Sequence, residues 1–320
     1  MDDSFKPAWW CRGPHAQTLW PYLIRRTARV ALRRERLELP DGDFLDLDWT
    51  PNTTGPIVAI LHGLEGSSDS PYARGILRAI ECRGWRGVIM HFRGCSGEPN
   101  RRPRSYHSGE TGDFAYFVEV LRQREPHTPL AAVGYSLGGN VLLKWMGEMG
   151  ERANLAAAVA VSVPFVLSEA ASRMEQGFSQ TYQWWLLRRL HRSIEEKRQR
   201  LSLPLTTNDP SSLWTFRDFD EHVTARLHDF DGADHYYRVS SSRQYLTGIT
   251  VNTLLLHAQD DPFMFAATVP HRDELSDSTT LELSEHGGHV GFVSGRWPWA
   301  ARYWLEERIP RYLEKFLARP

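Results

Sequence analysis

Short runs of apolar and β-branched residues recur along the chain and predict strands that are buried on both faces. The runs are Ile57 to Leu61, Val88 to Phe92, Leu130 to Tyr135, Ala156 to Val163, Val251 to His257 and Thr279 to Leu283. Most of them lack the alternation of apolar and polar residues that is typical of a sheet with one face in water. They therefore indicate a parallel sheet that is covered on both sides.

Amphipathic helices are predicted between several of these strands, because apolar residues recur there every three or four positions. The apolar positions are Tyr72, Ile76 and Ile80 within Pro71 to Arg83; Phe114, Phe117, Val118 and Leu121; and Val141, Leu142, Trp145 and Met149. The first helix is expected to stop at Gly84. Strands that alternate with helices predict an α/β fold, and we expect one domain over residues 1–320.

Residues 165–246 break this alternation, since they contain no convincing strand. We expect them to form a helical cap that is inserted into the single domain. The segment holds a Tyr-Gln-Trp-Trp-Leu-Leu run, followed by the charged residues Arg188 to Arg200. Either the tryptophans pack in the core and the charged helix is solvated, or the helix presents Trp184, Trp185 or Leu186 to an apolar ligand.

Composition and charge narrow the class of protein. With 320 residues, of which 41% are hydrophobic and 24% charged, the chain is typical of soluble globular proteins. The 38 Lys and Arg residues nearly balance 39 Asp and Glu residues, for a net charge of -1. No overall field attracts polyanions, and nucleic acid is not an expected partner.

Cysteine usage and apolar run lengths suggest a compartment. The three cysteines lie far apart and form no C-x-x-C pair, which favours a reducing cytoplasm. The first residues, Met1 to Pro7, lack the pattern of a signal peptide. The most apolar uncharged run, Leu155 to Leu167, is too short to span a bilayer. We therefore expect a soluble cytoplasmic protein without stable membrane insertion.

The motif Gly134-Tyr135-Ser136-Leu137-Gly138 lies directly after a predicted strand and directly before a predicted helix. A G-x-S-x-G sequence in that position forms a sharp turn that exposes the serine hydroxyl above the edge of the sheet. Glycines two residues to either side allow the backbones to pass closely. Ser136 is therefore the candidate nucleophile.

A serine hydroxyl needs a base to take its proton, and the base needs an acid to orient it. In this strand-turn-helix arrangement the acid follows the serine and precedes the histidine. The loop after the strand Val251 to His257 offers two aspartates. We favour Asp261 because Pro262 makes a tight loop after it, while Asp260 is the alternative, and either residue could instead cap the loop.

Three histidines follow these aspartates and are candidates for the base. His289 is preferred, because it lies in a glycine-rich loop after the strand Thr279 to Leu283. His271 precedes that strand. His286 is expected to shape the loop. The predicted catalytic residues are therefore Ser136, Asp261 and His289.

Acyl transfer places negative charge on the former carbonyl oxygen, and two backbone N–H groups are needed to stabilise it. One is expected from Leu137, the residue after the nucleophile. The other is expected from Leu64, in the turn His62-Gly63-Leu64-Glu65-Gly66 after the first predicted strand.

Several further motifs accompany G-x-S-x-G. They are Pro14-His15-Ala16-Gln17-Thr18, His62-Gly63-Leu64-Glu65-Gly66, His91-Phe92-Arg93-Gly94-Cys95-Ser96-Gly97, His107-Ser108-Gly109-Glu110-Thr111, Asp260-Asp261-Pro262-Phe263 and His286-Gly287-Gly288-His289. Together they resemble the YheT-like branch of the α/β-hydrolases over nearly the whole chain. The resemblance implies an eight-stranded sheet with a cap, a charge-relay system of Ser136, Asp261 and His289, and carboxylesterase activity on acyl esters. We expect the substrates to be small-molecule esters of short to medium chain length. Some eukaryotic members of that branch are membrane-anchored lipases or phospholipases.

The same catalytic residues are also consistent with functions other than ester hydrolysis. The machinery that hydrolyses an ester also passes an acyl group to an alcohol, so an acyltransferase is the closest alternative, followed by a lipase or phospholipase. A non-catalytic binding protein on a hydrolase scaffold is a third.

The basic residues Arg93, Arg101, Arg102 and Arg104 have two interpretations. They bind local carboxylates such as Glu98 or Glu110, or they pair with a phosphate or carboxylate on the substrate. The sequence contains no HExxH motif, no G-x-G-x-x-G after a strand and no P-loop. No metal or nucleotide cofactor is therefore expected.

Overall fold

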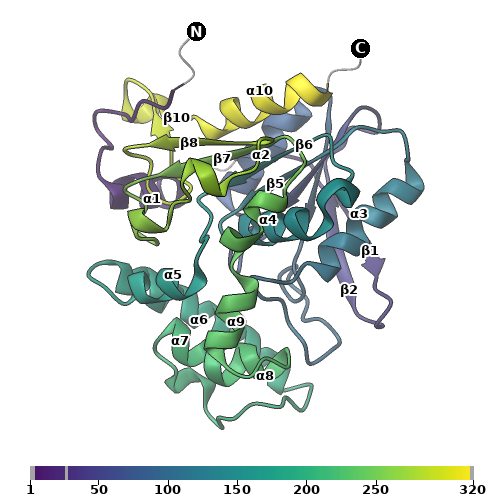
Figure 1. The fold of residues 1–320 in the computed structure, drawn as a ribbon, viewed down its shortest axis with the longest axis vertical. Coiled ribbons are helices and arrows are strands. Elements are labelled where there is room, and N and C mark those ends of the chain that lie inside the picture. Colours follow the sequence, from purple (N-terminus) through teal and green to yellow (C-terminus); the bar gives the residue numbers. More distant parts are fainter. Residues whose placement is uncertain (1–3, 26–27, 318–320) are drawn as a thin grey trace.

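The computed structural model describes residues 4–25 and 28–317. Met1 to Asp3, which belong to the stretch that we predict is not a signal peptide, lie outside the described residues. Its centre is an eight-stranded sheet with the order β1-β2-β4-β3-β5-β6-β7-β8 (Figure 1). The strands are β1 (Arg33–Glu38), β2 (Phe44–Trp49), β3 (Ile57–Leu61), β4 (Arg86–Met90), β5 (Leu130–Tyr135), β6 (Ala157–Val161), β7 (Thr253–Ala258) and β8 (Thr279–Ser284). From β4 to β8 all neighbours pair in parallel, which confirms the predicted fold class.

Helices cover both faces of this sheet. Those that pack on it are α2 (Pro71–Glu81), α3 (Gly112–Arg124), α4 (Leu137–Met149) and α10 (Leu305–Leu317). Residues of β3 alternate between the two cores: Ile57, Ala59 and Leu61 join α3 and α4, whereas Val58 and Ile60 join α2 and α10. The apolar runs therefore lack polar alternation because neither face of the strand contacts water.

The ends of some strands differ from the prediction. β4 begins at Arg86, two residues before the predicted Val88, and ends at Met90 instead of Phe92. The start of the strand is not apparent from the sequence because Arg86 is charged; its side chain forms an ion pair with Glu125, the residue after α3, and donates to the carbonyl of Gly55. A charged residue with fixed partners is thus buried inside a strand.

The hairpin of β1 and β2 is missing from the prediction. β1 pairs antiparallel with β2, and β2 with β4. Two arginines of β1 lie directly opposite aspartates of β2: Arg34 contacts Asp48 at 2.8 Å, and Arg36 contacts Asp46 at 2.9 Å. Cross-strand ion pairs, rather than apolar periodicity, align these strands.

Residues 165–246, between β6 and β7, contain helices and turns and no strand. Figure 1 shows them as a group below the sheet. They are α5 (Leu167–Met174), α6 (Ser179–Arg198), η2 (Pro210–Ser212), α7 (Phe216–Phe219), η3 (Asp220–Thr224), α8 (Ala225–Leu227), α9 (Ala233–Ser240) and η4 (Ser242–Gly248). The group has small apolar cores of its own, around Leu187 with Phe219 and around Leu167 with Tyr236.

The interpretation that the tryptophans of this segment pack in the core is wrong. The side chains of Trp184 and Trp185 are exposed by 46% and 38%, while Tyr182 and Leu186 are buried. The period of α6 places residues 182 and 186 on the inner face and residues 184 and 185 on the outer face. The charged end of α6 is mostly exposed, as expected, but Lys197 is buried.

The remaining elements frame the start and the end of the chain. They are α1 (Pro14–Leu23), η1 (Gly150–Ala153), η5 (Ala266–Thr268), η6 (Arg272–Glu274), β9 (Val293–Ser294), η7 (Pro298–Ala300) and β10 (Arg302–Tyr303). Buried Gln17 joins α1 to β9, because its amide donates to the Val293 carbonyl and accepts from the Val293 N–H. Among the described helices, none is both long and apolar enough to cross a membrane.

Candidate active site

Ser136 lies at the sharp turn between β5 and α4. Its φ of 51° falls in the left-handed region that non-glycine residues rarely occupy. The flanking glycines allow the turn: a Cβ on Gly134 would lie 2.5 Å from the carbonyl oxygen of Gly138, and one on Gly138 would lie 2.5 Å from that of His62. The close packing of strand, turn and helix thus exposes the serine side chain.

The structure brings Ser136, His289 and Asp261 into one hydrogen-bonded chain. His289 Nε2 lies 3.0 Å from Ser136 Oγ, and His289 Nδ1 lies 2.9 Å from Asp261 Oδ2. Because an ionised carboxylate only accepts, Nδ1–H donates to Asp261, which leaves Nε2 to accept from the serine hydroxyl. Asp261 is buried with 3% of its surface exposed, so its hydrogen bond to His289 is shielded from water.

The alternative acid, Asp260, has a different set of partners. Its Oδ1 accepts from the Gly288 N–H at 2.9 Å, and its Oδ2 lies 3.2 Å from His286 Nδ1. Both contacts hold the loop that carries His289. His271 is exposed at the start of η6, and its backbone N–H donates to Glu274. The structure thus joins Asp261, and neither Asp260 nor His271, to the serine.

The turn after β3 leaves one backbone N–H available beside Ser136. The N–H groups of Gly63, Glu65 and Gly66 donate to Tyr72 Oη, Tyr106 Oη and the Gly63 carbonyl. That of Leu64 has no acceptor among the described residues. The N–H of Leu137, the first residue of α4, likewise has none in the part of the chain described.

His62 fixes the shape of this turn. Its Nε2 accepts from the Phe92 N–H at 3.1 Å, so its Nδ1 carries the proton and donates to the Gly63 carbonyl at 2.7 Å. Burial lowers the pKa of His62 to about 3, and the ring therefore stays neutral. A Cβ on Gly63 would lie 3.4 Å from the Cβ of Ser136, so the turn runs close beside the serine.

Two residues that position His289 are not among those predicted. The hydroxyl of Thr18, on α1, accepts from the His289 N–H at 2.9 Å. The ring of Phe263 stacks on the imidazole, with centroids 3.9 Å apart and an angle of 7° between the planes. Both lie in motifs that carry the family resemblance, at Ala16-Gln17-Thr18 and Asp261-Pro262-Phe263, and that was the signal available.

A cavity of about 170 Å³ lies over the serine. Its wall includes Ser136, His289, Leu64 and Leu137, together with the inner face of α6 and parts of α5, α7 and α9. Apolar side chains form much of this wall, among them Leu167, Met174, Leu186, Leu190, Ile194, Phe216 and Val223. Leu186 therefore faces the cavity, as expected if α6 presents a side chain to an apolar ligand. Trp184 and Trp185 do not line the cavity.

Lys197 marks a polar part of the same wall. Its ammonium donates to the Arg104 carbonyl and to Ser105 Oγ, each at 2.9 Å, and so ties α6 to the loop after β4. Burial lowers the pKa of Lys197 to about 8.

Three of the four basic residues after β4 bind carboxylates of the protein, and the fourth binds a backbone carbonyl. Buried Arg93 contacts Asp41, Asp43 and Asp113, at 2.7, 2.9 and 2.7 Å. Arg101 pairs with Glu38, Arg102 donates to the Asp41 carbonyl, and Arg104 pairs with Glu110. Glu98, however, pairs with Arg36. These contacts support the local-carboxylate interpretation of the arginines.

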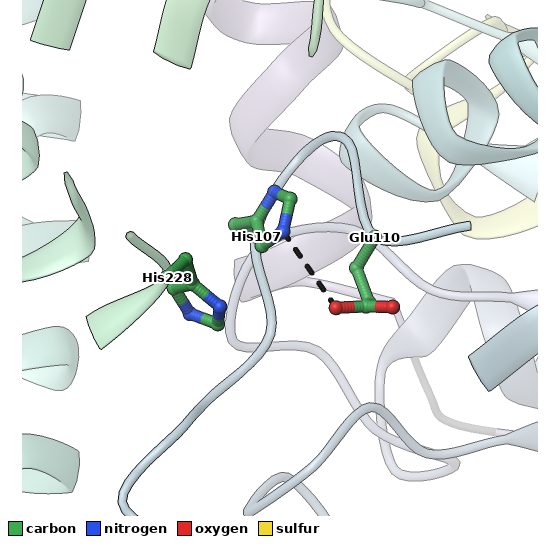
Figure 2. Close-up of side chains that lie close together, drawn as sticks. All are labelled: His107, Glu110 and His228. Carbon is green, nitrogen blue, oxygen red and sulfur yellow. Dashed lines mark ion pairs between the residues drawn. The ribbon is translucent and has the colours of Figure 1, made fainter. Parts of the chain in front are cut away.

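One cluster has the residue types of a metal site. The ligand atoms of His107, Glu110 and His228 lie within 4.8 Å of one another (Figure 2). His107 Nδ1 accepts from the Gly109 N–H at 3.1 Å, so in the neutral ring Nε2 carries the proton and faces Glu110 at 3.6 Å. Glu110 is also paired with Arg104. A ring whose Nε2 carries the proton and a carboxylate already paired with Arg104 do not fit a metal ion.

Burial keeps both imidazoles of this cluster neutral. It lowers the pKa of His107 to about 3 and that of His228 to about 2. Their rings meet edge to face with centroids 4.5 Å apart. The cluster therefore packs the helical segment against the loop after β4.

Comparison with known proteins agrees with this geometry. A family model described as "alpha/beta hydrolase fold" matches residues 56–295. The chain is 45% identical to "Putative esterase YheT" of Escherichia coli (strain K12), over 95% of this chain and 91% of that one. It is 28% identical to "Phospholipase ABHD3" of Mus musculus, over 95% of this chain and 76% of that one.

A yeast relative and a solved structure extend the comparison. "Monoacylglycerol lipase" of Saccharomyces cerevisiae is 31% identical, over 89% of this chain and 64% of that one. The structure of the Pyrococcus furiosus esterase Pf2001 covers 90% of this chain and 92% of its own, with a TM-score of 0.59 and 15% identity, and so shares the fold. The chain therefore belongs to the α/β-hydrolase family, in its YheT-like branch of ester hydrolases.

Proposed function

We propose that the protein is a serine carboxylesterase that hydrolyses small-molecule acyl esters through an acyl-enzyme on Ser136. The observation that carries the proposal is the hydrogen-bonded chain from Ser136 Oγ through His289 to Asp261. It lies in the wall of an apolar cavity, beside the available N–H groups of Leu64 and Leu137. A nucleophile, a base with its orienting acid, and donors for an oxyanion are the parts that acyl transfer requires.

In this mechanism Ser136 Oγ attacks the ester carbonyl carbon while His289 Nε2 takes the hydroxyl proton. Negative charge on the former carbonyl oxygen is stabilised by the N–H groups of Leu64 and Leu137. Collapse of this intermediate breaks the bond to the alcohol, which leaves with the proton from His289. Water then attacks the acyl-enzyme by the same route and releases the carboxylic acid, with Asp261 orienting the imidazole throughout.

Residues 165–246 act as a cap that selects the acyl group. The inner face of α6 contributes Leu186, Leu190 and Ile194 to the cavity, and these side chains favour an apolar chain. We expect short to medium acyl chains to fit. We also place the enzyme in the cytoplasm, since its cysteines are free and a reducing compartment keeps them so.

Hydrolysis of p-nitrophenyl esters from acetate to palmitate tests this function. The wild type is expected to turn over the short and medium esters and to slow with the longest, and Ser136→Ala is expected to lose turnover on all of them. Equal rates for the two proteins would contradict the proposal. The chain-length profile of the wild type measures the size of the cavity.

A further inference from the structure

Large aromatic side chains are exposed on one side of the molecule. They come from the segment before α1 and from its end, from the start of α6, and from the loop between β9 and β10. Six of them are Trp9, Tyr22, Trp184, Trp185, Trp297 and Trp299. Leu23 and Ile24, which follow Tyr22, are also exposed. A patch of this kind on a soluble domain marks an interaction surface.

The aromatic residues contact one another across these segments. The rings of Tyr22 and Trp185 meet edge to face, 5.2 Å apart, and so join α1 to α6. Trp9 meets Trp297 at 6.5 Å, and Trp297 stacks on Trp299 at 5.4 Å. Figure 1 shows α1 beside β10, on the same side of the molecule. The exposed rings therefore belong to neighbouring parts of one surface.

The three segments are free of acidic residues. Residues 4–25, 176–194 and 295–305 contain no Asp or Glu, but they contain three, three and two Lys or Arg residues. The whole chain, in contrast, has a net charge of -1. Positive charge is thus concentrated in the segments that expose the aromatic side chains.

Several of these arginines are free to act on a partner. Arg12, Arg188, Arg192 and Arg296 are exposed, and no carboxylate of the described residues forms an ion pair with them. Three guanidinium groups lie over exposed rings: Arg188 over Trp184 at 4.8 Å, Arg189 over Trp185 at 5.0 Å and Arg296 over Trp297 at 5.4 Å. We use the name aromatic–arginine face for the six aromatic residues together with Arg12, Arg188, Arg189, Arg192 and Arg296.

Tryptophan and tyrosine favour the region between water and lipid tails, where the ring is half solvated. Arginine binds lipid phosphates in a bidentate manner and attracts anionic headgroups. We propose that the aromatic–arginine face docks the protein on the surface of a bilayer that contains anionic lipid. Its rings enter the headgroup layer, its arginines pair with phosphates, and none of the helices in the described part of the chain crosses the membrane.

Docking in this way places the cavity next to the bilayer. The outer side of α6 carries Trp184 and Trp185, while its inner side lines the cavity with Leu186 and Leu190. Arg189 donates to Tyr22 Oη and to the Glu65 carbonyl, and so joins the face to the turn that holds Leu64. Membrane binding itself does not depend on the proposed function and is measured without turnover.

Co-sedimentation with vesicles tests the proposal, with phosphatidylcholine alone or mixed with phosphatidylglycerol, at low and high salt. The wild type is expected to bind the anionic vesicles and to be released by salt. Trp184→Ser/Trp185→Ser and Arg188→Gln/Arg192→Gln are each expected to weaken binding. Because one arginine near an anionic surface contributes about fivefold to the partition coefficient, the arginine pair should cost about 30-fold.

Matched controls remove the same groups from positions outside the three segments. Trp214 is exposed but is flanked by Asp209 and Asp218, and Trp214→Ser should bind like the wild type. Arg83→Gln/Arg152→Gln removes two exposed arginines outside the three segments and should also bind like the wild type. Circular dichroism checks that every variant is folded.

Three outcomes would overturn the proposal. The first is a wild type that fails to bind anionic vesicles at low salt. The second is binding that the face variants and the control variants reduce equally. The third is a dimer in solution that Trp184→Ser/Trp185→Ser dissociates while vesicle binding is unchanged, which would assign the face to a second copy of the chain.

Discussion

Adjacent aspartates differ in role because their side chains leave the loop after β7 in different directions. Asp261 is buried against His289, whereas Asp260 accepts from the backbone of Gly288 and contacts His286. The first contact orients the imidazole that faces Ser136, and the second holds the loop in which that imidazole lies. Substituting each aspartate in turn therefore distinguishes the orientation of the His289 imidazole from the structure of the loop that carries it.

Asp261→Asn is expected to lower kcat by about ten-thousand-fold with little change in KM, because an amide no longer stabilises the imidazolium or selects its tautomer. Asp260→Asn keeps an oxygen for the Gly288 N–H and is expected to lose far less. Steady-state kinetics on p-nitrophenyl butyrate measures both. A larger loss of kcat in Asp260→Asn than in Asp261→Asn would show that Asp260, and not Asp261, orients the imidazole.

Asp220 provides a prediction on pH and stability. Burial raises the pKa of this carboxyl from 3.8 to about 6, although it accepts from the hydroxyls of Thr224 and Tyr237. The folded protein therefore holds a proton that the unfolded chain releases near pH 3.8. The resulting stability is present below that pH and is lost as the pH rises through about 6.

Asp220→Asn keeps the shape of the side chain and cannot ionise. Between pH 4 and pH 6 the free energy of unfolding of the wild type is thus expected to fall more steeply than that of the variant. Urea unfolding at several pH values gives both slopes. Parallel slopes would mean that Asp220 is ionised alike in the folded and unfolded states.

At the scale of elements, the turn between β5 and α4 depends on glycines that no other residue replaces. A Cβ on Gly138 would lie 2.5 Å from two carbonyl oxygens of β3 and the turn after it, those of Leu61 and His62. Backbone at that distance must move, and the turn that places Ser136 moves with it. Gly13, in contrast, has open space around its Cβ position.

Gly138→Ala is expected to lower the free energy of unfolding by about 2 kcal/mol or more, since an overpacked core site with no flexible neighbour costs that much. Gly13→Ala is expected to cost about 1 kcal/mol or less. Thermal or urea unfolding of the two variants checks the difference. Similar stabilities would show that the turn accommodates the added methyl group of Gly138→Ala without strain.

Elements with an apolar period could be predicted from the sequence, and those held by polar contacts could not. The strand Ile57–Leu61 packs apolar side chains on both faces and has the predicted bounds. β1 is aligned instead by pairs such as Arg34 with Asp48, which become visible only when the two strands are side by side. On α6 the sequence left open which of Trp184, Trp185 and Leu186 faces a ligand, because that depends on which face of the helix has a neighbour.

At the scale of the whole molecule, the candidate site joins parts of the chain that lie far apart in sequence. The residues that the structure brings together around Ser136 were predicted, because each lies in a motif at the end of a strand. Thr18 was not, since its contact with His289 spans 271 residues and links α1 to the loop after β8. Nor does any local pattern show that Phe263 stacks on that imidazole.

The central claim is that Ser136 carries the acyl group during turnover. Rapid quenching of the enzyme with p-nitrophenyl butyrate, followed by mass spectrometry of the intact protein and its peptides, tests it most directly. We expect one butyryl group, located on the peptide that contains Ser136, and a matching burst of p-nitrophenol, both absent in Ser136→Ala. A burst that persists in Ser136→Ala, or an acyl group on another residue, would contradict the proposed mechanism.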